Sequence, residues 1–339
     1  MGTAKQKDIR ISLIRMISTM MVVLLHITQQ MEKFVLNLNI ITDWLNLGLV
    51  MFFCISAFLY SKREIKNVFK WYGHRYAEIA IPAIITSVIT IVAFALIGKG
   101  NIPRRNIFAA IMSGMGFEAF LSDSWMFIQL WFLTYLLFFY FTFPLAQKAN
   151  CKSGSEVGFW VKFILIAMFA QIAVITIEWV FKIELLSVGI LLRFYLPYFT
   201  LRRYDINDFK LERIMKFFLI IAVIMIGVTA CFRYVLSIPS ISAITELMFI
   251  YTQTLSGFVL FYCLYRAFEK IKTYSTVLRL SDTYSYNIYL THCLFIGYST
   301  SVIFLFSSKV IGIILALILT AVASILLRYL TYGVKKLLP

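Results

Sequence analysis

Residues 9–31 read IRISLIRMISTMMVVLLHITQQM, a long apolar run broken by two ionisable side chains, Arg15 and His26. About 20 residues of helix cross the roughly 30 Å hydrocarbon core of a bilayer. The run is longer than the core of a signal peptide, and no small-residue cleavage site follows it. We therefore expect it to be retained as the first membrane-spanning helix.

The rest of the chain repeats this pattern. Charged residues make up only 14% of the 339, and mean hydropathy is +0.86, whereas a soluble domain is about 25% charged. In lipid, the backbone N–H and C=O groups of each spanning segment must form hydrogen bonds within the protein. We therefore expect an all-α membrane helix bundle. We predict about ten spans, at 9–31, 46–60, 76–98, 126–147, 157–179, 184–201, 216–236, 243–265, 284–306 and 309–331. The stretch 106–121, which glycine and methionine interrupt, is predicted to be interfacial or re-entrant.

The net charge of +16 is distributed unevenly along the chain. Of the 32 Lys and Arg residues, 22 fall in one set of alternating inter-span segments and 7 in the other. Cytoplasmic segments carry such an excess of positive charge. The distribution predicts ten helices with both termini in the cytoplasm, and it explains the charge without a nucleic-acid partner.

The spacing of cysteine and histidine predicts neither a disulfide framework nor a metal site. The five cysteines show no paired spacing, and no histidine-rich ligand set is present. There is also no internal repeat and no linker. We expect residues 1–339 to form a single transmembrane domain with no appended soluble domain.

Arg15 and His26 are the most informative of the intramembrane ionisable residues, which are functional candidates because they are costly in lipid. Eleven residues of helix amount to three turns plus roughly 20°, so the two side chains share one face, about 16 Å apart along the axis. That geometry suits a molecule that enters from the cytoplasm with its anionic end at Arg15 and its reactive end at His26. A histidine bonded between helices and an arginine that snorkels to the cytoplasm would give the same spacing.

The remaining candidates have ordinary explanations beside functional ones. Lys162 and Arg328 lie near cytoplasmic ends and can snorkel, and His292 is expected to bond with a neighbouring helix. His74 is expected in a cytoplasmic loop. The other intramembrane candidates are Glu78 and Arg193.

A basic cluster precedes the third predicted span. It provides either ordinary inside-facing charge or a mouth that binds phosphates. Its members are Lys62, Arg63, Lys66, Lys70, His74 and Arg75. The aromatic stretch from Trp125 to Trp131 is similarly an interfacial belt or, alternatively, a platform for a sugar ring.

Five motifs in order resemble those of acyltransferase family three, membrane proteins that move acyl groups onto carbohydrate hydroxyls. They are Arg15 with His26; Phe52-Phe53-Cys54-Ile55-Ser56-Ala57-Phe58-Leu59; Arg75 with Pro82; Leu130-Trp131-Phe132-Leu133 with Pro144; and Ser285-Tyr286-Asn287-Ile288-Tyr289-Leu290-Thr291-His292. Two positions depart from the family pattern. Ala57 replaces a usual glycine, and Glu78 stands where a second arginine is usual. Either His74 or Lys70 substitutes for that arginine, or Glu78 pairs with Arg75 or Arg15.

The resemblance implies transfer of an acyl group, with acetyl as the expected group, from a cytoplasmic acyl-CoA to a hydroxyl of a polysaccharide or lipid-linked glycan at the outer side. His26 would be the catalytic residue, as a general base or as a transient acyl carrier. The donor phosphates would contact Arg15, Arg75, Lys70 and His74, with Glu78, Arg193, Trp131 and His292 in supporting positions. Acetyl-CoA would be a co-substrate, no cofactor would be permanently bound, and the protein would be a multi-pass protein of a bacterial plasma membrane.

The sequence is also compatible with two other functions. Intramembrane Arg and His also mark substrate paths in transporters, so a flippase for a lipid-linked glycan is one alternative. A polymerase-type membrane protein is the other. Hydrolysis of acyl-CoA would separate an enzyme of the proposed kind from both.

Overall fold

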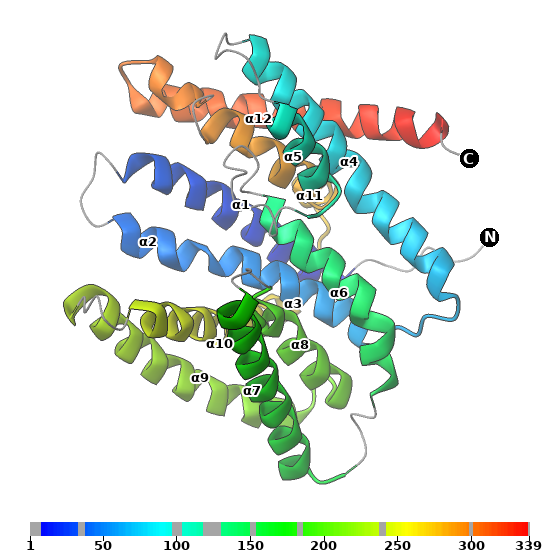
Figure 1. Cartoon of the computed structure of the whole chain (residues 1–339), viewed down its shortest axis with the longest axis vertical. Coiled ribbons are helices and arrows are strands. Elements are labelled where there is room, and N and C mark those ends of the chain that lie inside the picture. Colours follow the sequence, from blue (N-terminus) through cyan, green and yellow to red (C-terminus); the bar gives the residue numbers. More distant parts are fainter. Residues whose placement is uncertain are drawn as a thin grey trace. The chain divides into compact units, whose positions relative to one another are not determined.

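The computed structural model describes residues 8–32, 38–96, 104–117, 130–149, 154–181, 186–236, 242–297 and 301–337, and every regular element in these ranges is helical (Figure 1). This confirms the all-α prediction for the part of the chain described. The α-helices are α1 (Ile9–Met31), α2 (Leu38–Leu45), α3 (Leu47–Ser61), α4 (Val68–Leu96), α5 (Arg104–Gly114), α6 (Trp131–Lys148), α7 (Glu156–Phe181), α8 (Val188–Arg203), α9 (Phe209–Ala230), α10 (Ser242–Ala267), α11 (Thr276–Ile296) and α12 (Lys309–Leu337). Short elements of other helical types are η3 (Cys231–Leu236), η5 (Phe268–Lys270) and η7 (Val302–Leu305).

Each of the ten predicted spans overlaps a helix, but length and composition alone single out only some of these helices as membrane spans. Within the described ranges, seven segments meet that condition: Ile9–Met31, Ile40–Ser61, Val68–Leu96, Glu156–Phe181, Phe209–Tyr234, Ala243–Lys270 and Lys309–Leu337. Helices α6, α8 and α11 are not among them. The stretch predicted to be interfacial or re-entrant contains α5, whose 11 residues are too few to span a bilayer.

Three helices begin well before their apolar runs. Helix α4 begins at Val68, α9 at Phe209 and α11 at Thr276, each seven or eight residues ahead of its predicted start. A polar residue caps each of these ends: Asn67, Asp208 and Ser275 accept hydrogen bonds from the backbone N–H groups of Lys70, Lys210 and Leu278. The prediction that His74 lies in a loop was therefore wrong, because it lies in the second turn of α4.

The described chain divides into two compact units. Unit 1 comprises Met1–Ser18, Leu47–Glu64 and Phe143–Thr273, and unit 2 comprises Thr19–Asn46, Ile65–Thr142 and Tyr274–Pro339. Each unit is built from segments that are distant in sequence. Helices α1 and α6 each contribute residues to both units.

In unit 1, α10 packs against α3, α8 and α9. Glycines allow the close approach: a Cβ at Gly257 would lie 2.4 Å from Cγ1 of Val50, and one at Gly189 would lie 2.6 Å from Cγ2 of Ile250. Thr254 adds a hydrogen bond from its hydroxyl to the carbonyl oxygen of Gly189, 3.1 Å away. Small residues and hydroxyl bonds of this kind are typical of helix packing in membranes.

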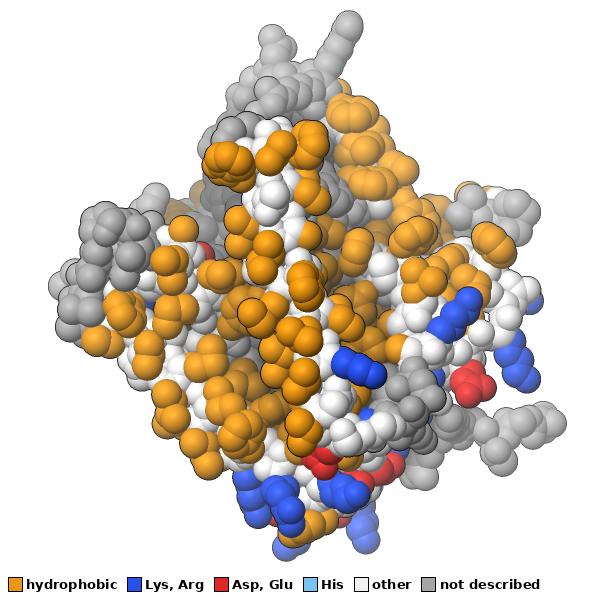
Figure 2. All heavy atoms as spheres, turned by 60° about the horizontal axis from the view of Figure 1, so that its bottom comes forward, with side chains coloured by type: hydrophobic (Ala, Val, Ile, Leu, Met, Phe, Trp, Pro, Cys, Tyr) orange, Lys and Arg blue, Asp and Glu red, His pale blue; other side chains and the backbone are white. Residues whose placement is uncertain are grey.

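Helix α7 of unit 1 has no buried residue, and large apolar side chains are exposed along its whole length. Figure 2 shows a face where hydrophobic side chains cover most of the coloured surface, while charged side chains gather towards its margin. Exposure of such an apolar surface to water is energetically unfavourable, so the surface is suited to contact with lipid.

In unit 2, α11 packs against α12 and α4, and η7 packs on α12. The second half of α1 contributes Val23 and Ile27 to an apolar cluster with Ile296, Ile303 and Ala316. The backbone of η7 lies directly on α12, because a Cβ at Gly312 would be only 2.3 Å from the carbonyl oxygen of Ile303. This packing fixes the part of α1 that carries His26 beside α11.

Candidate functional site

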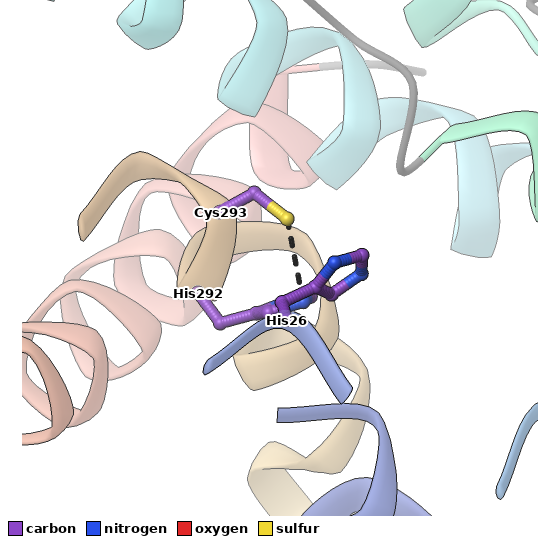
Figure 3. A group of neighbouring side chains, drawn as sticks. All are labelled: His26, His292 and Cys293. Atoms are coloured by element: carbon purple, nitrogen blue, oxygen red, sulfur yellow. Dashed lines mark hydrogen bonds between the residues drawn. The ribbon is translucent and has the colours of Figure 1, made fainter. Parts of the chain in front are cut away.

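His26 and His292 lie together in unit 2, one on α1 and the other on α11. Their ring centroids are 4.9 Å apart and the ring planes are tilted by 37° (Figure 3). Nδ1 of His26 is 2.7 Å from Oε1 of Gln29, one turn further along α1. An amide oxygen can only accept, so this contact keeps the proton on Nδ1 and the lone pair on Nε2.

His292 is fully buried, and its protonation pattern follows from its neighbours. Nδ1 lies 3.1 Å from the carbonyl oxygen of Ile288, which can only accept. The proton therefore sits on Nδ1, and Nε2 accepts from the thiol of Cys293, whose Sγ is 3.3 Å away (Figure 3). The structure thus gives this histidine partners on its own helix and places its ring against His26.

Polar side chains hold α11 in place beside α12 and α4. Asn287 donates to the carbonyl oxygen of Ser324, 3.1 Å away, and the hydroxyl of Tyr286 donates to the carbonyl oxygen of Ile79 at 2.8 Å. The latter contact lies one turn before Pro82, whose ring disturbs the backbone hydrogen bonds of α4. The polar residues around His292 therefore anchor the helix that carries it.

Tyr289 connects His292 to aromatic side chains of α6. The ring of Tyr289 lies 5.9 Å from that of His292 and 5.4 Å from that of Phe132 on α6. Trp131 begins α6 and contacts Tyr135 edge-on, with centroids 5.6 Å apart. Trp125, the other end of the predicted aromatic stretch, lies outside the described residues.

The basic residues expected to bind a donor lie on α4, in unit 2. Lys70 and His74 are exposed and one turn apart, whereas Arg75 is partly buried. Glu78, the departure from the family pattern, forms an ion pair with Lys335 of α12, with Nζ and Oε1 2.6 Å apart. The structure thus gives Glu78 a cationic partner that sequence reasoning had not considered.

The two other arginines of interest belong to unit 1. Arg15 lies on α1 and is partly buried. Arg193 on α8 is almost completely buried and donates from Nη2 to Oε1 of Gln253 on α10, 2.8 Å away. Arg193 therefore connects two packed helices of unit 1, and leaving its charge without such a bond would be costly in lipid.

Two members of the histidine site were not among the predicted residues. Gln29 stands three positions after His26, a spacing that places the two side chains on one helix face, so the sequence held a signal for it. Cys293 gave no such signal. Its proximity to His26 depends on how α11 packs beside α1, and the spacing of cysteines along the chain does not predict that packing.

The helices and this site define the class of the molecule: a multi-helix membrane protein with a histidine pair held between two of its helices. Comparison with protein families gives a match to the acyltransferase domain of acyltransferase family 3 over residues 8–329, nearly the whole chain, and the protein belongs to that family. Neither the curated proteins nor the solved structures gave a match. Membership supports the function of a membrane acyltransferase and confirms the resemblance seen in the sequence motifs.

Proposed function

We propose that the protein is an O-acyltransferase that moves acetyl from cytoplasmic acetyl-CoA to a hydroxyl of a cell-surface or lipid-linked polysaccharide at the outer side of the membrane. The observation that carries this proposal is the contact of Nδ1 of His26 with Oε1 of Gln29, which favours the tautomer with a free lone pair on Nε2, in a chain of an acyltransferase family. Transfer to an alcohol needs a group that takes the hydroxyl proton, and neutral imidazole does so near neutral pH.

In the proposed reaction, Nε2 of His26 accepts the proton of the acceptor hydroxyl as its oxygen attacks the thioester carbonyl. The carbon–sulfur bond then breaks and CoA leaves as the thiolate, which takes up the proton carried by the imidazole. Gln29 keeps the reactive nitrogen unprotonated at the start of the cycle. His292 packs against the ring of His26 and supports the packing of α1 on α11.

The donor would be held by positive charge. Arg15, Arg75, Lys70 and His74 are the residues we assign to the phosphates of CoA, since charge-assisted hydrogen bonds to phosphate are the strongest that a protein offers. Trp131 is assigned to the acceptor, because an aromatic face can pack against a sugar ring. Arg193 and Glu78 support the helices through their contacts with Gln253 and Lys335.

The proposal includes ten spans with both termini in the cytoplasm of a bacterial cell. Contacts within unit 1 support it, because they join segments that the charge distribution assigns to the same side. Lys62 and Asp205 form an ion pair at 2.5 Å, which lowers the pKa of the aspartate, and Arg266 donates to Asn207 at 3.3 Å. The positive-inside rule assigns all four of these residues to the cytoplasm.

The test is acetyl transfer by the purified full chain, supplied with labelled acetyl-CoA and surface glycan from cells that lack the protein. We expect transfer by the wild type, and a rate about 100- to 10,000-fold lower for His26→Ala, because that is the typical contribution of a general base. His292→Ala should mainly lower stability and retain turnover per folded molecule. Near-normal turnover of His26→Ala would show that His26 is not the general base. If the wild type shows neither acetyl transfer nor acyl-CoA hydrolysis, the result would favour a transporter.

A further inference from the structure

The two histidines and Cys293 bring three metal-ligating side chains together. One ring nitrogen from each histidine and Sγ of Cys293 all lie within 4.8 Å of one another (Figure 3). In a tetrahedral zinc site, with bonds of about 2.0 to 2.3 Å, ligand atoms are roughly 3.3 to 3.6 Å apart. Nε2 of His292 and Sγ of Cys293 are already 3.3 Å apart, so only the remaining contacts would have to shorten.

The hydrogen bonds around the cluster favour, in both rings, the tautomer that a metal-bound histidine adopts. A histidine ligand almost always donates its other ring N–H to an oxygen, which fixes the tautomer and the ring. Nδ1 of His26 faces Oε1 of Gln29 at 2.7 Å, and Nδ1 of His292 faces the carbonyl oxygen of Ile288 at 3.1 Å. Both Nε2 atoms are thereby left with a lone pair.

We propose that His26, His292 and Cys293 form a binding site for a thiophilic divalent cation, with Zn²⁺ as the representative ion. A thiolate with two imidazoles favours zinc over magnesium or calcium, which prefer oxygen ligands. Binding forms a bond from Sγ of Cys293 to the ion and releases the thiol proton to water. Three protein ligands leave the fourth position open to water.

The three ligands differ in how deeply they are buried. His292 and Cys293 are buried, with exposed fractions of 0% and 2%. His26 is only partly buried, and its neighbour Gln29 is exposed, so His26 is the most accessible of the three ligands. The site is thus distinct from surface histidines and carboxylates that bind metals loosely.

The bound ion would have a direct effect on the proposed reaction. It would occupy the lone pair of His26 that has to accept the proton of the acceptor hydroxyl. Micromolar Zn²⁺ would therefore inhibit transfer, and a chelator would restore it. This consequence rests on the proposed function, whereas the binding site itself does not.

The decisive experiment is a titration of the purified, metal-free full chain with Co²⁺ and with Zn²⁺. Co²⁺ bound to a thiolate gives a charge-transfer band in the near ultraviolet, which reports the Cys293 ligand without any assay of activity. We expect this band to saturate at one ion per chain and Zn²⁺ to displace Co²⁺. Cys293→Ala should abolish the band and weaken Zn²⁺ binding at least tenfold.

Cys54→Ala is the matched control, because Cys54 is also a buried free cysteine but lies on α3 of unit 1. It should leave the band and the stoichiometry unchanged. Absence of the band in the wild type, or equal Zn²⁺ affinity of the wild type and Cys293→Ala, would overturn the proposed site. If the protein binds one ion but its metal-free form transfers no acetyl, the metal site stands and the proposed function is wrong.

Discussion

At the residue scale, the histidine site shows which contacts a sequence can and cannot predict. His26 could be singled out because an imidazole on a spanning helix is costly and because it shares a face with Arg15. Its place 4.9 Å from His292 could not, since 265 residues separate the two and nothing along the chain reports how α1 and α11 pack. Helical spacing predicts neighbours on one helix, and only tertiary packing supplies neighbours on another.

Gln29 provides the residue-scale prediction. Gln29→Leu removes the oxygen that holds Nδ1 of His26 while keeping a similar side-chain volume. Loss of the partner that orients a metal-ligating histidine typically costs 10- to 100-fold. We expect a fall of about that size in kcat for acetyl transfer, with little change in KM. Gln29→Glu, which keeps an acceptor oxygen, should restore most of kcat. Wild-type kcat in Gln29→Leu would show that this contact does not position the imidazole.

At the element scale, the positions of the helices were predicted well and their starts were not. The prediction began each helix where the apolar run begins. However, α4, α9 and α11 begin at the capping residues Asn67, Asp208 and Ser275, seven or eight residues earlier. Helix formation depends on satisfied backbone N–H groups, whereas hydropathy reports only contact with lipid. Consequently Lys70, His74 and Arg75 are held on a helix, which gives the proposed donor contacts a defined spacing.

Helix α12 offers an element-scale prediction with an internal control. A Cβ at Gly312 would lie 2.3 to 2.8 Å from backbone atoms of Ile303, so Gly312→Ala forces η7 away from α12. Overpacking of this kind costs typically 1–3 kcal/mol, and we expect lower thermal stability of the protein in detergent. Gly333→Ala, on the same helix with no atom within 4 Å of the new Cβ, should be neutral or stabilising by about 0.5–1 kcal/mol. Equal melting temperatures of both variants and the wild type would show that η7 does not pack on α12 as described.

At the scale of the whole molecule, the open question is how many helices cross the membrane. The seven apolar segments omit α6, α8 and α11, although each coincides with a predicted span. Helix α11 carries buried polar side chains, and two of them, Asn287 and Thr291, donate to carbonyl oxygens of α12. Polar side chains that are hydrogen-bonded in this way are compatible with a spanning helix. A mean hydropathy takes no account of such bonds and therefore underestimates how readily the helix spans. Sequence composition therefore identified a membrane protein, and the alternation of charge was needed to argue for the additional spans.

Cysteine labelling at two exposed positions tests this count, because α9, α10 and α11 all lie between Asn207 and Ser308. If all three helices cross, the two positions lie on opposite sides of the membrane, and the charge distribution places Ser308 outside. In a variant without the native cysteines, a membrane-impermeant maleimide applied to intact cells should label Ser308→Cys and not Asn207→Cys, and permeabilised cells should label both. If α11 does not cross, only α9 and α10 separate the two positions, and intact cells would label both or neither. That outcome would remove α11, the helix that carries His292, from the count of spanning helices, and it would reverse the side on which the C-terminus lies.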